Sequence, residues 1–300
     1  MTSLLVVGEV LAEFMRPSRD SPLNETAVMM GPFPSGAPGI FASAAARLGI
    51  PTSLCAVVGD DPFGQLIRDR LQQDGVNVDG VSIHPKRTTA VAFVAYASTG
   101  ERTFVFHVSE AAAATLRPGD LGRQPEETDW LHISGSSLAL GSPLAETAIE
   151  AARRVKLAGG RVSVDPNIRA EASTRGVLAS IRSLAQQADF LFPSEGELDA
   201  LGLDEAELLG TGAVICTTLA AKGARVRCGE LDVPVPAPTA NEVDPTGAGD
   251  IFAAGFVAAT LRGAAPVEAA ELGCAIAARS VETLGSMESS IDALEVERAR

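Results

Sequence analysis

Short runs of consecutive apolar residues recur along the chain, separated by stretches with a helical period. The runs at residues 3–9, 54–58 and 130–133 have the length and uninterrupted apolarity of strands that are buried on both faces. Helices are expected at residues 41–48 and 145–158. Further apolar runs lie at residues 162–164, 190–192 and 214–216. Strands that alternate with helices favour a parallel sheet with right-handed crossovers, so the expected fold class is α/β.

One region departs from this alternation. Residues 81–84, 89–96 and 102–108 alternate between apolar and polar side chains with a period of two, which is typical of antiparallel strands. Such an insertion favours a small antiparallel β lid over a site, and an extra hairpin at the sheet edge is the alternative. Residues 8–15 alternate in the same way, with Glu13 among apolar neighbours. For Glu13, a solvated strand face and a ligand contact both remain open.

Polar clusters follow the predicted strands. Because open α/β sheets bind ligands at the carboxyl ends of their strands, these clusters are expected to lie around one site. The clusters are Ser134–Ser137, Asp165–Arg169, Ser194–Glu197 and Thr217–Thr218.

The composition restricts the partners. The chain has 300 residues, of which 46% are hydrophobic and 21% charged, and this suits a globular protein with a large core. Its formal net charge of -14 argues against nucleic acid and anionic membranes as partners. An anionic ligand would therefore need local positive potential from helix N-termini, a metal ion and a few placed Arg or Lys residues.

The four cysteines are widely spaced and form no CxxC pair or Cys/His cluster. Buried free thiols in a reducing compartment explain them better than a zinc site, so the expected location is the cytoplasm. No apolar stretch has the length of a signal peptide or a membrane span.

The most informative stretch is residues 243–256, where a glycine-bearing turn leads into a helix of small apolar residues. Gly247 and Gly249 have no Cβ, so a ligand can approach the backbone closely. A helix that begins near Gly249 presents unpaired N–H groups and the positive end of its dipole, which together attract an anion. Asp250 lies at the edge of this anion-binding site and can accept a proton from a hydroxyl that attacks phosphorus. A plain βα turn with an Asp cap is the alternative.

The whole string resembles the signature of the PfkB/ribokinase family of sugar and nucleoside kinases, whose usual form is DTxGAGD. Pro245 stands where many members carry Thr. The resemblance implies that Asp250 is the catalytic base and that Gly247, Ala248 and Gly249 supply the N–H groups for the transferred phosphoryl group.

The resemblance covers nearly the whole chain and implies a single domain over residues 1–300. The implied fold is ribokinase-like and doubly wound, with a mostly parallel sheet and helices on both faces. The resemblance also implies a small antiparallel β lid, formed by residues at about 10–17 and 81–108. In such proteins the lid often pairs with that of another subunit, so a homodimer through the lid is expected.

The stretch 35–49 resembles the family's N-terminal motif, commonly GGAPANVAxxxARLG. Gly36 and Ala37 match and are implied at the sugar, as is Glu13, an acid at about the place where the family accepts sugar hydroxyls. Ile40 replaces an Asn that often binds the sugar.

Three motifs imply the metal and nucleotide contacts. Asp165-Pro-Asn-x-Arg169 resembles DPNxR and Ser194-x-x-Glu197 resembles NxxE, so Asp165 and Glu197 are implied to hold Mg²⁺ through water. Arg169 is implied to bind an anionic group of the sugar or ATP, with a surface Arg after a capped helix start as the alternative.

Ala220 replaces the first Gly of a TxGxxG motif. The implied ATP-binding residues are Ser194, Thr218, Ala220, Gly223, Thr246, Gly247, Gly249 and Ala278. The implied cofactors are ATP and Mg²⁺, with a monovalent cation as a further candidate.

The order of motifs is most similar to the 2-keto-3-deoxygluconate kinase and tagatose kinase subgroup. His107 stands about where sugar-acid kinases of that subgroup carry an Arg that binds the carboxylate, so His107 is implied at the sugar. The expected activity is ATP-dependent phosphorylation of a primary hydroxyl of a small sugar, either a ketohexose such as tagatose or fructose, or 2-keto-3-deoxygluconate. A nucleoside or ribose kinase and a non-catalytic sugar sensor of the same fold are the alternatives.

Overall fold

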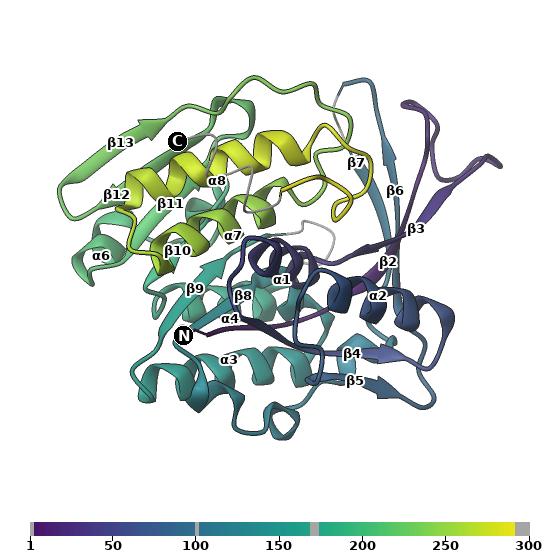
Figure 1. Cartoon of the computed structure of the whole chain (residues 1–300), viewed down its shortest axis with the longest axis horizontal. Helices are drawn as coiled ribbons and strands as arrows, with labels where there is room; N and C mark the ends of the chain where they lie inside the picture. Colours follow the sequence, from purple (N-terminus) through teal and green to yellow (C-terminus); the bar gives the residue numbers. More distant parts are fainter. Residues whose placement is uncertain (1–2, 100–101, 169–173, 292–300) are drawn as a thin grey trace.

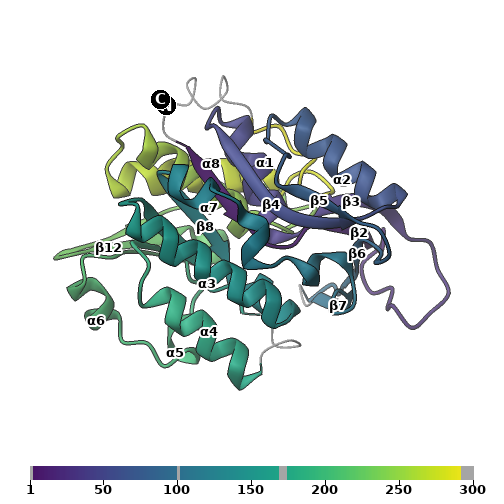
Figure 2. The ribbon, with the colours of Figure 1, turned by 90° about the horizontal axis from the view of Figure 1, so that it is seen from below.

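The computed structural model describes residues 3–99, 102–168 and 174–291 and has three layers, with a nine-stranded sheet between two sets of helices (Figures 1 and 2). The strand order is β13-β12-β11-β10-β9-β8-β1-β4-β5, and all neighbours from β11 to β5 are parallel. The strands are β1 (Leu4–Val7), β4 (Thr52–Gly59), β5 (Val81–His84), β8 (Trp130–Ser134), β9 (Arg161–Asp165), β10 (Phe190–Leu191), β11 (Val214–Thr218), β12 (Ala224–Cys228) and β13 (Leu231–Val235). Strands β12 and β13 form an antiparallel edge. The doubly wound, mostly parallel α/β fold is confirmed.

Helices cover both faces of this sheet (Figure 2). One face carries α1 (Ala37–Arg47), α2 (Pro62–Gln73), α7 (Ala248–Leu261) and α8 (Pro266–Ser280). The other carries α3 (Ser142–Leu157), α4 (Arg175–Ala185), α5 (Glu197–Ala200) and α6 (Glu205–Gly210). The short 3₁₀ helices are η1 (Ala112–Thr115), η2 (Pro118–Leu121), η3 (Gln124–Glu127), η4 (Gly135–Leu140) and η6 (Ala220–Lys222). In β1, Leu4 and Val6 pack into one core while Leu5 and Val7 pack into the other, which explains the continuous apolar run.

Helix α7 is buried over most of its length. Its residues from Asp250 to Ala259 are all buried, so almost no side of it faces water. Two glycines allow its close packing against α8: a Cβ on Gly255 would overlap Ile276, and one on Gly273 would lie 2.8 Å from the Phe252 ring. The position of the turn before α7 is therefore fixed by the core.

Helix α1 begins earlier than the sequence predicted, at Ala37 and not near residue 41. Gly36, with φ of 100°, is its N-cap, and Pro38 lies in the first turn. A proline is tolerated there because the first turn needs no internal N–H donor. The Pro/Gly-rich residues 31–39 thus form most of a strand, Met30–Ser35, and the first turn of α1.

A second sheet of four strands in the order β3-β2-β6-β7 forms the lid, at the right of Figure 1. Its strands are β2 (Leu11–Met15), β3 (Met30–Ser35), β6 (Ala90–Tyr96) and β7 (Arg102–His107). The outer pairs β2–β3 and β6–β7 are antiparallel, and the central pair β2–β6 is parallel. The prolines of β3 lie on an edge strand, where a missing N–H donor costs no ladder hydrogen bond.

The prediction that residues 81–84 belong to the lid is wrong. This segment is β5, which pairs with β4 in the large sheet, with Val81 opposite Ala56. An edge strand of the main sheet has one exposed face, so its side chains alternate like those of a lid strand.

All four cysteines are free, and Cys55, Cys216 and Cys274 are buried. Burial raises the pKa of the Cys55 and Cys274 thiols to about 11, so both are protonated at neutral pH. Across residues 3–99, 102–168 and 174–291, no helix combines the length and apolarity needed to cross a membrane.

Candidate active site

The turn before α7 exposes the backbone at one point. Gly247 is the N-cap of α7 and has a left-handed backbone with φ of 77°. Its Cα faces α1, because a Cβ there would lie 2.9 Å from Cγ2 of Ile40. Gly249 is exposed, and a Cβ on it would meet nothing within 4 Å. Open space therefore borders the first turn of α7 at Gly249. The first N–H groups of α7 have no acceptor within the helix, and that of Ala248 donates to the Pro245 carbonyl at 3.3 Å.

Asp250 follows directly in the first turn of α7 and is only 5% exposed. It lies at the positive end of the helix dipole. The predicted base and the predicted N–H donors thus lie on consecutive residues of one helix start, which is the arrangement that the sequence implied.

Asp244 holds the turn in place and was not predicted as a site residue. Its Oδ1 accepts hydrogen bonds from the Thr246 N–H at 3.0 Å and from the Tyr96 hydroxyl at 2.7 Å. Its Oδ2 accepts from the Gly285 N–H at 2.9 Å. Burial, and next the neighbouring Asp244 carboxylate, raise the pKa of Tyr96, so the hydroxyl stays protonated and remains a donor. Tyr96 is the chain's single tyrosine, but nothing in its local sequence indicates this long-range contact.

Glu13 lies on the inner side of the lid and not on a solvated strand face. It is 2% exposed, and its Oε2 accepts a hydrogen bond from the Ser35 hydroxyl at 2.6 Å. Ser35 immediately precedes Gly36 and Ala37, where α1 begins. The structure therefore brings together Glu13, Gly36 and Ala37, three of the residues predicted at the sugar.

His107 is the exception among the predicted sugar residues. Glu13 pairs with Ala92, and Ala92 pairs with Phe106, so Phe106 shares the face of Glu13. His107 pairs with Val91 on the opposite face, where it is exposed and meets the Phe93 ring edge-on. A shift of one residue along a strand reverses the face, and approximate spacing in the sequence cannot resolve such a shift.

The two residues predicted to hold Mg²⁺ are linked through the loop after β9. Asp165 is buried at the end of β9 and accepts a hydrogen bond from the Asn167 N–H at 2.9 Å. Glu197 accepts from the Ile168 N–H at 2.6 Å and from the Ser194 N–H at 2.7 Å. Carboxylate oxygens have further lone pairs for water around a cation, so this pair suits Mg²⁺ held through its own waters. Arg169 lies outside the described residues.

A polar network crosses the carboxyl ends of three neighbouring strands. The Asn167 amide donates to the Ser134 hydroxyl at 3.1 Å, and Ser134 lies 3.0 Å from the Ser136 hydroxyl. Ser136 in turn donates to Glu9 at 2.9 Å. Glu9 is buried and was not predicted as a site residue; the apolar run before it predicted only a strand end.

Four of the predicted nucleotide residues, Ser194, Thr218, Ala220 and Gly223, follow the ends of β10 and β11. Ser194 forms a parallel bridge with Thr218, and the Thr218 hydroxyl lies 3.4 Å from that of Ser194. Gly223, with φ of 101°, closes the following turn, and a Cβ on it would overlap the backbone of β13. Ala278 is half-buried on α8, the helix that packs beside β12 and β13.

Ala220 departs from the glycine of the TxGxxG motif and has a left-handed backbone, with φ of 51°. This conformation costs a non-glycine residue roughly 1–2 kcal/mol. We expect Ala220→Gly to raise the free energy of unfolding by about 0.5–1 kcal/mol, after the greater freedom of glycine in the unfolded chain is subtracted. Thermal unfolding would measure this, with Ala221→Gly as the control, because Ala221 is not left-handed. Equal destabilisation by both changes would contradict the prediction.

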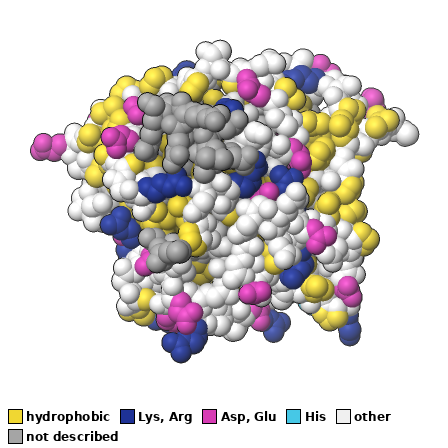
Figure 3. Space-filling view, viewed as in Figure 1, with side chains coloured by type: hydrophobic (Ala, Val, Ile, Leu, Met, Phe, Trp, Pro, Cys, Tyr) yellow, Lys and Arg dark blue, Asp and Glu magenta, His cyan; other side chains and the backbone are white. Residues whose placement is uncertain are grey.

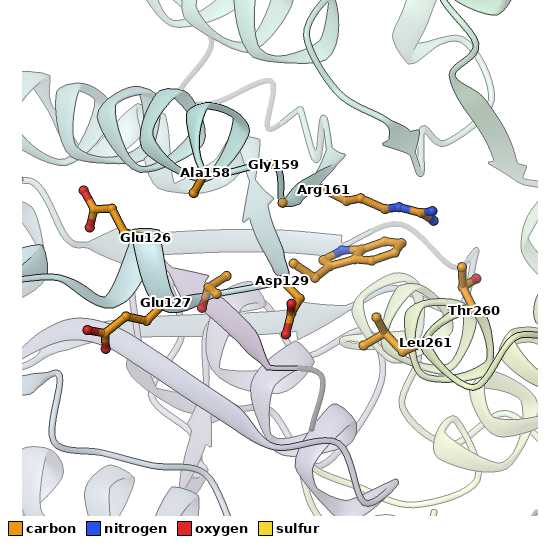
Figure 4. A pocket seen from close by; sticks show the side chains of 11 residues that line it. Glu126, Glu127, Asp129, Ala158, Gly159, Arg161, Thr260 and Leu261 are labelled. Carbon is orange, nitrogen blue, oxygen red and sulfur yellow. The ribbon is translucent and has the colours of Figure 1, made fainter.

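A hollow of about 480 Å³ lies at the other end of the sheet (Figure 4). Its lining includes Asp129 and Trp130 at the start of β8 and Arg161 at the start of β9. The candidate site is built at the carboxyl ends of the same strands, so this hollow is separate from it.

An N–H-lined turn beside a buried carboxylate, at the carboxyl edge of a doubly wound sheet and under a β lid, defines a phosphotransferase of the sugar-kinase type. The pfkB family carbohydrate kinase model matches residues 1–293, and the chain belongs to this family. It is a carbohydrate kinase.

The comparisons with individual proteins agree. A fructokinase of Vibrio alginolyticus is 32% identical over 273 residues, which are 87% of this chain and 85% of that protein. An Escherichia coli protein provisionally assigned as ribokinase II, solved with ATP and Mg²⁺, has a TM-score of 0.93 and 31% identity, with 99% of this chain and 98% of that chain covered. Fructokinase from Vibrio cholerae, solved as a double mutant with fructose, ADP and a potassium ion, has a TM-score of 0.85 and 25% identity, with 99% and 98% covered.

Proposed function

We propose that this protein transfers the γ-phosphoryl group of ATP to a primary hydroxyl of a neutral ketohexose, with fructose as the first candidate. The observation that carries this proposal is the buried Asp250 next to the exposed Gly249, whose backbone borders open space. Phosphoryl transfer needs little from the protein beyond positioning and electrostatic stabilisation, and this turn is built to supply both.

In the proposed reaction, Asp250 takes the proton of the sugar hydroxyl as its oxygen forms a bond to phosphorus. The bond between that phosphorus and the β–γ bridging oxygen breaks, and ADP leaves. The N–H groups of Gly247, Ala248 and Gly249 stabilise the charge on the transferred group. Glu13 accepts a hydrogen bond from another sugar hydroxyl, and Arg169 binds an anionic group of the substrate or of ATP.

Mg²⁺ would be held through water by Asp165 and Glu197, where it neutralises charge on the phosphates. The ATP-binding residues are the predicted set around Ser194, Thr218 and Gly223. A monovalent cation is a further proposed cofactor, supported by the potassium ion in the Vibrio cholerae fructokinase structure. We place the reaction in the cytoplasm, because four free cysteines suit a reducing compartment.

A neutral sugar is favoured over a sugar acid by the charge of the site. Glu9, Glu13, Asp244 and Asp250 are all buried around it. A substrate carboxylate would be repelled by these groups, and the exposed His107 on the far face of the lid offers it no compensation.

Coupled ADP release with a panel of acceptors tests the proposal. The panel contains fructose, tagatose, 2-keto-3-deoxygluconate, ribose and adenosine, each assayed with Mg²⁺ in potassium and in sodium buffer. We expect kcat/KM for a ketohexose to exceed that for 2-keto-3-deoxygluconate at least tenfold. Binding of a sugar, detected by a rise in Tm, without ADP release from any acceptor would overturn it in favour of a sugar sensor.

The outer face of the lid supports a homodimer. Phe14 and Phe93 stack there with ring centroids 5.4 Å apart, and Val105 on the same face is 42% exposed. In Figure 3, apolar side chains gather along the side where Figure 1 places the lid strands. A second copy of the lid is the occupant that we propose for this face.

We expect Val105→Asp to weaken dimerisation at least tenfold, because a charge buried between two lids would have to be desolvated. The control is Ile149→Asp on α3, where Ile149 is 37% exposed outside the lid. Sedimentation at several concentrations would measure the effect. A monomeric wild type, or equal dimerisation of the two variants, would contradict the proposal.

A further inference from the structure

We propose that Tyr96 is a positioning residue that connects the lid to the phosphate-binding turn through Asp244; this rests on the proposed function. Tyr96 is the last residue of β6, and Asp244 lies 148 positions further along the chain. The Tyr96 hydroxyl donates to Asp244 Oδ1 at 2.7 Å, and the Thr246 hydroxyl donates to the Tyr96 oxygen. Both partners belong to the turn that leads into α7.

The Asp244 carboxylate joins three separate segments. It accepts from Tyr96 of the lid, from the Thr246 N–H of the turn at 3.0 Å, and from the Gly285 N–H at 2.9 Å. Asp244 is 1% exposed, so water cannot replace a missing donor without a rearrangement. Backbone bonds from the Val243 and Asp244 N–H groups to the Val281 carbonyl also hold this turn, and β6 adds the side-chain bond from Tyr96.

The hydrogen bonds of Tyr96 lie next to the N–H groups that are proposed to bind the phosphoryl group. Thr246 precedes Gly247, the left-handed N-cap residue that sets where the first N–H groups of α7 point. A lid displaced from the body would withdraw the Tyr96 hydroxyl from Asp244 and Thr246 together. The geometry thus couples the lid that carries Glu13 to the N–H groups that stabilise the transferred phosphoryl group.

The aromatic ring and the hydroxyl of Tyr96 have separable roles. The ring belongs to a small apolar cluster with Met15, Val94 and Phe104, and Tyr96 is 8% exposed. Tyr96→Phe keeps this packing and removes only the hydroxyl, so it isolates the hydrogen bonds to the turn.

Steady-state kinetics of Tyr96→Phe test the inference. We expect kcat with fructose to fall about tenfold, while KM for ATP and for fructose each change less than about threefold. This split identifies an interaction used mainly in the transition state. The control is Thr147→Val on α3, which removes a fully buried hydroxyl that donates to Leu116 and Pro143 far from the site. It is expected to lower Tm and leave kcat unchanged.

A second arm uses Thr246→Val, alone and combined with Tyr96→Phe. Because the two hydroxyls share one hydrogen bond, the double variant is expected to be little slower than the slower single variant. Wild-type kcat in Tyr96→Phe, or fully multiplicative losses in the double variant, would overturn the inference. A wild-type enzyme that phosphorylates no sugar would instead refute the proposed function.

Discussion

Asp250→Asn is expected to lower kcat about a thousandfold while nucleotide binding and folding persist. Asparagine has nearly the same shape but cannot take the proton of the attacking hydroxyl, and general base catalysis is typically worth about 10²–10⁴ in rate. Asp250 is buried at the start of α7, so the side-chain amide of the asparagine should occupy the position of the carboxylate. ADP release would measure kcat, and calorimetry would measure the affinity for ATP.

The matched control is Asp204→Asn, which removes the same charge at the N-cap of α6. Asparagine caps a helix about as well as aspartate, so this variant should keep wild-type turnover and stability. Turnover in Asp250→Asn within tenfold of the wild type would remove Asp250 from the role of base.

Gly249→Ala is expected to lower kcat about a hundredfold with no loss of stability. The added methyl group meets no protein atom within 4 Å, so the chain tolerates it. It projects into the space in which the transferred phosphoryl group is proposed to bind. The methyl group would push the phosphoryl group away from the N–H donors, and one such donor is typically worth about 10²–10³ in rate. The measurements are kcat from ADP release and Tm from thermal unfolding.

Gly210→Ala serves as the control for that change. Gly210 ends α6, and a Cβ there also meets nothing within 4 Å. Both variants should unfold near the wild-type temperature, and only Gly249→Ala should lose activity. Equal activity of the two would show that the turn does not contact the phosphoryl group.

The sequence predicted best those parts of the site that are local in the chain. The turn at residues 243–250 and the start of α7 depend on Gly247, Gly249 and the apolar helix after them. The polar ends of the parallel strands were also predictable, because parallel strands place all their carboxyl ends at one edge. The family resemblance added the roles of these residues, which their types alone leave open.

The lid was less predictable, because it is assembled from segments far apart in the chain. Leu11 of β2 pairs with Ala90 of β6, and no local pattern specifies that register. The face on which His107 lies, and the contact of Tyr96 with Asp244, both follow from this pairing. Residues 81–84 also alternate between apolar and polar side chains, and they were assigned to the wrong sheet because local alternation does not specify the partner strand.

The departures from the family pattern have structural explanations at two positions. Ile40 is buried beneath the turn, where its Cγ2 faces Gly247, so a side chain that supports the backbone replaces the expected Asn. Ala220 has a left-handed backbone, a conformation that glycine adopts readily.

The most direct test is a crystal structure of the wild-type protein with fructose and a non-hydrolysable ATP analogue. A primary hydroxyl oxygen of fructose is expected within about 2.6–3.2 Å of an Asp250 carboxylate oxygen, the distance required of a general base. The γ-phosphate should meet the N–H groups of Gly247–Gly249. A fructose bound with every hydroxyl beyond hydrogen-bond reach of Asp250, or a γ-phosphate placed away from that turn, would contradict the account.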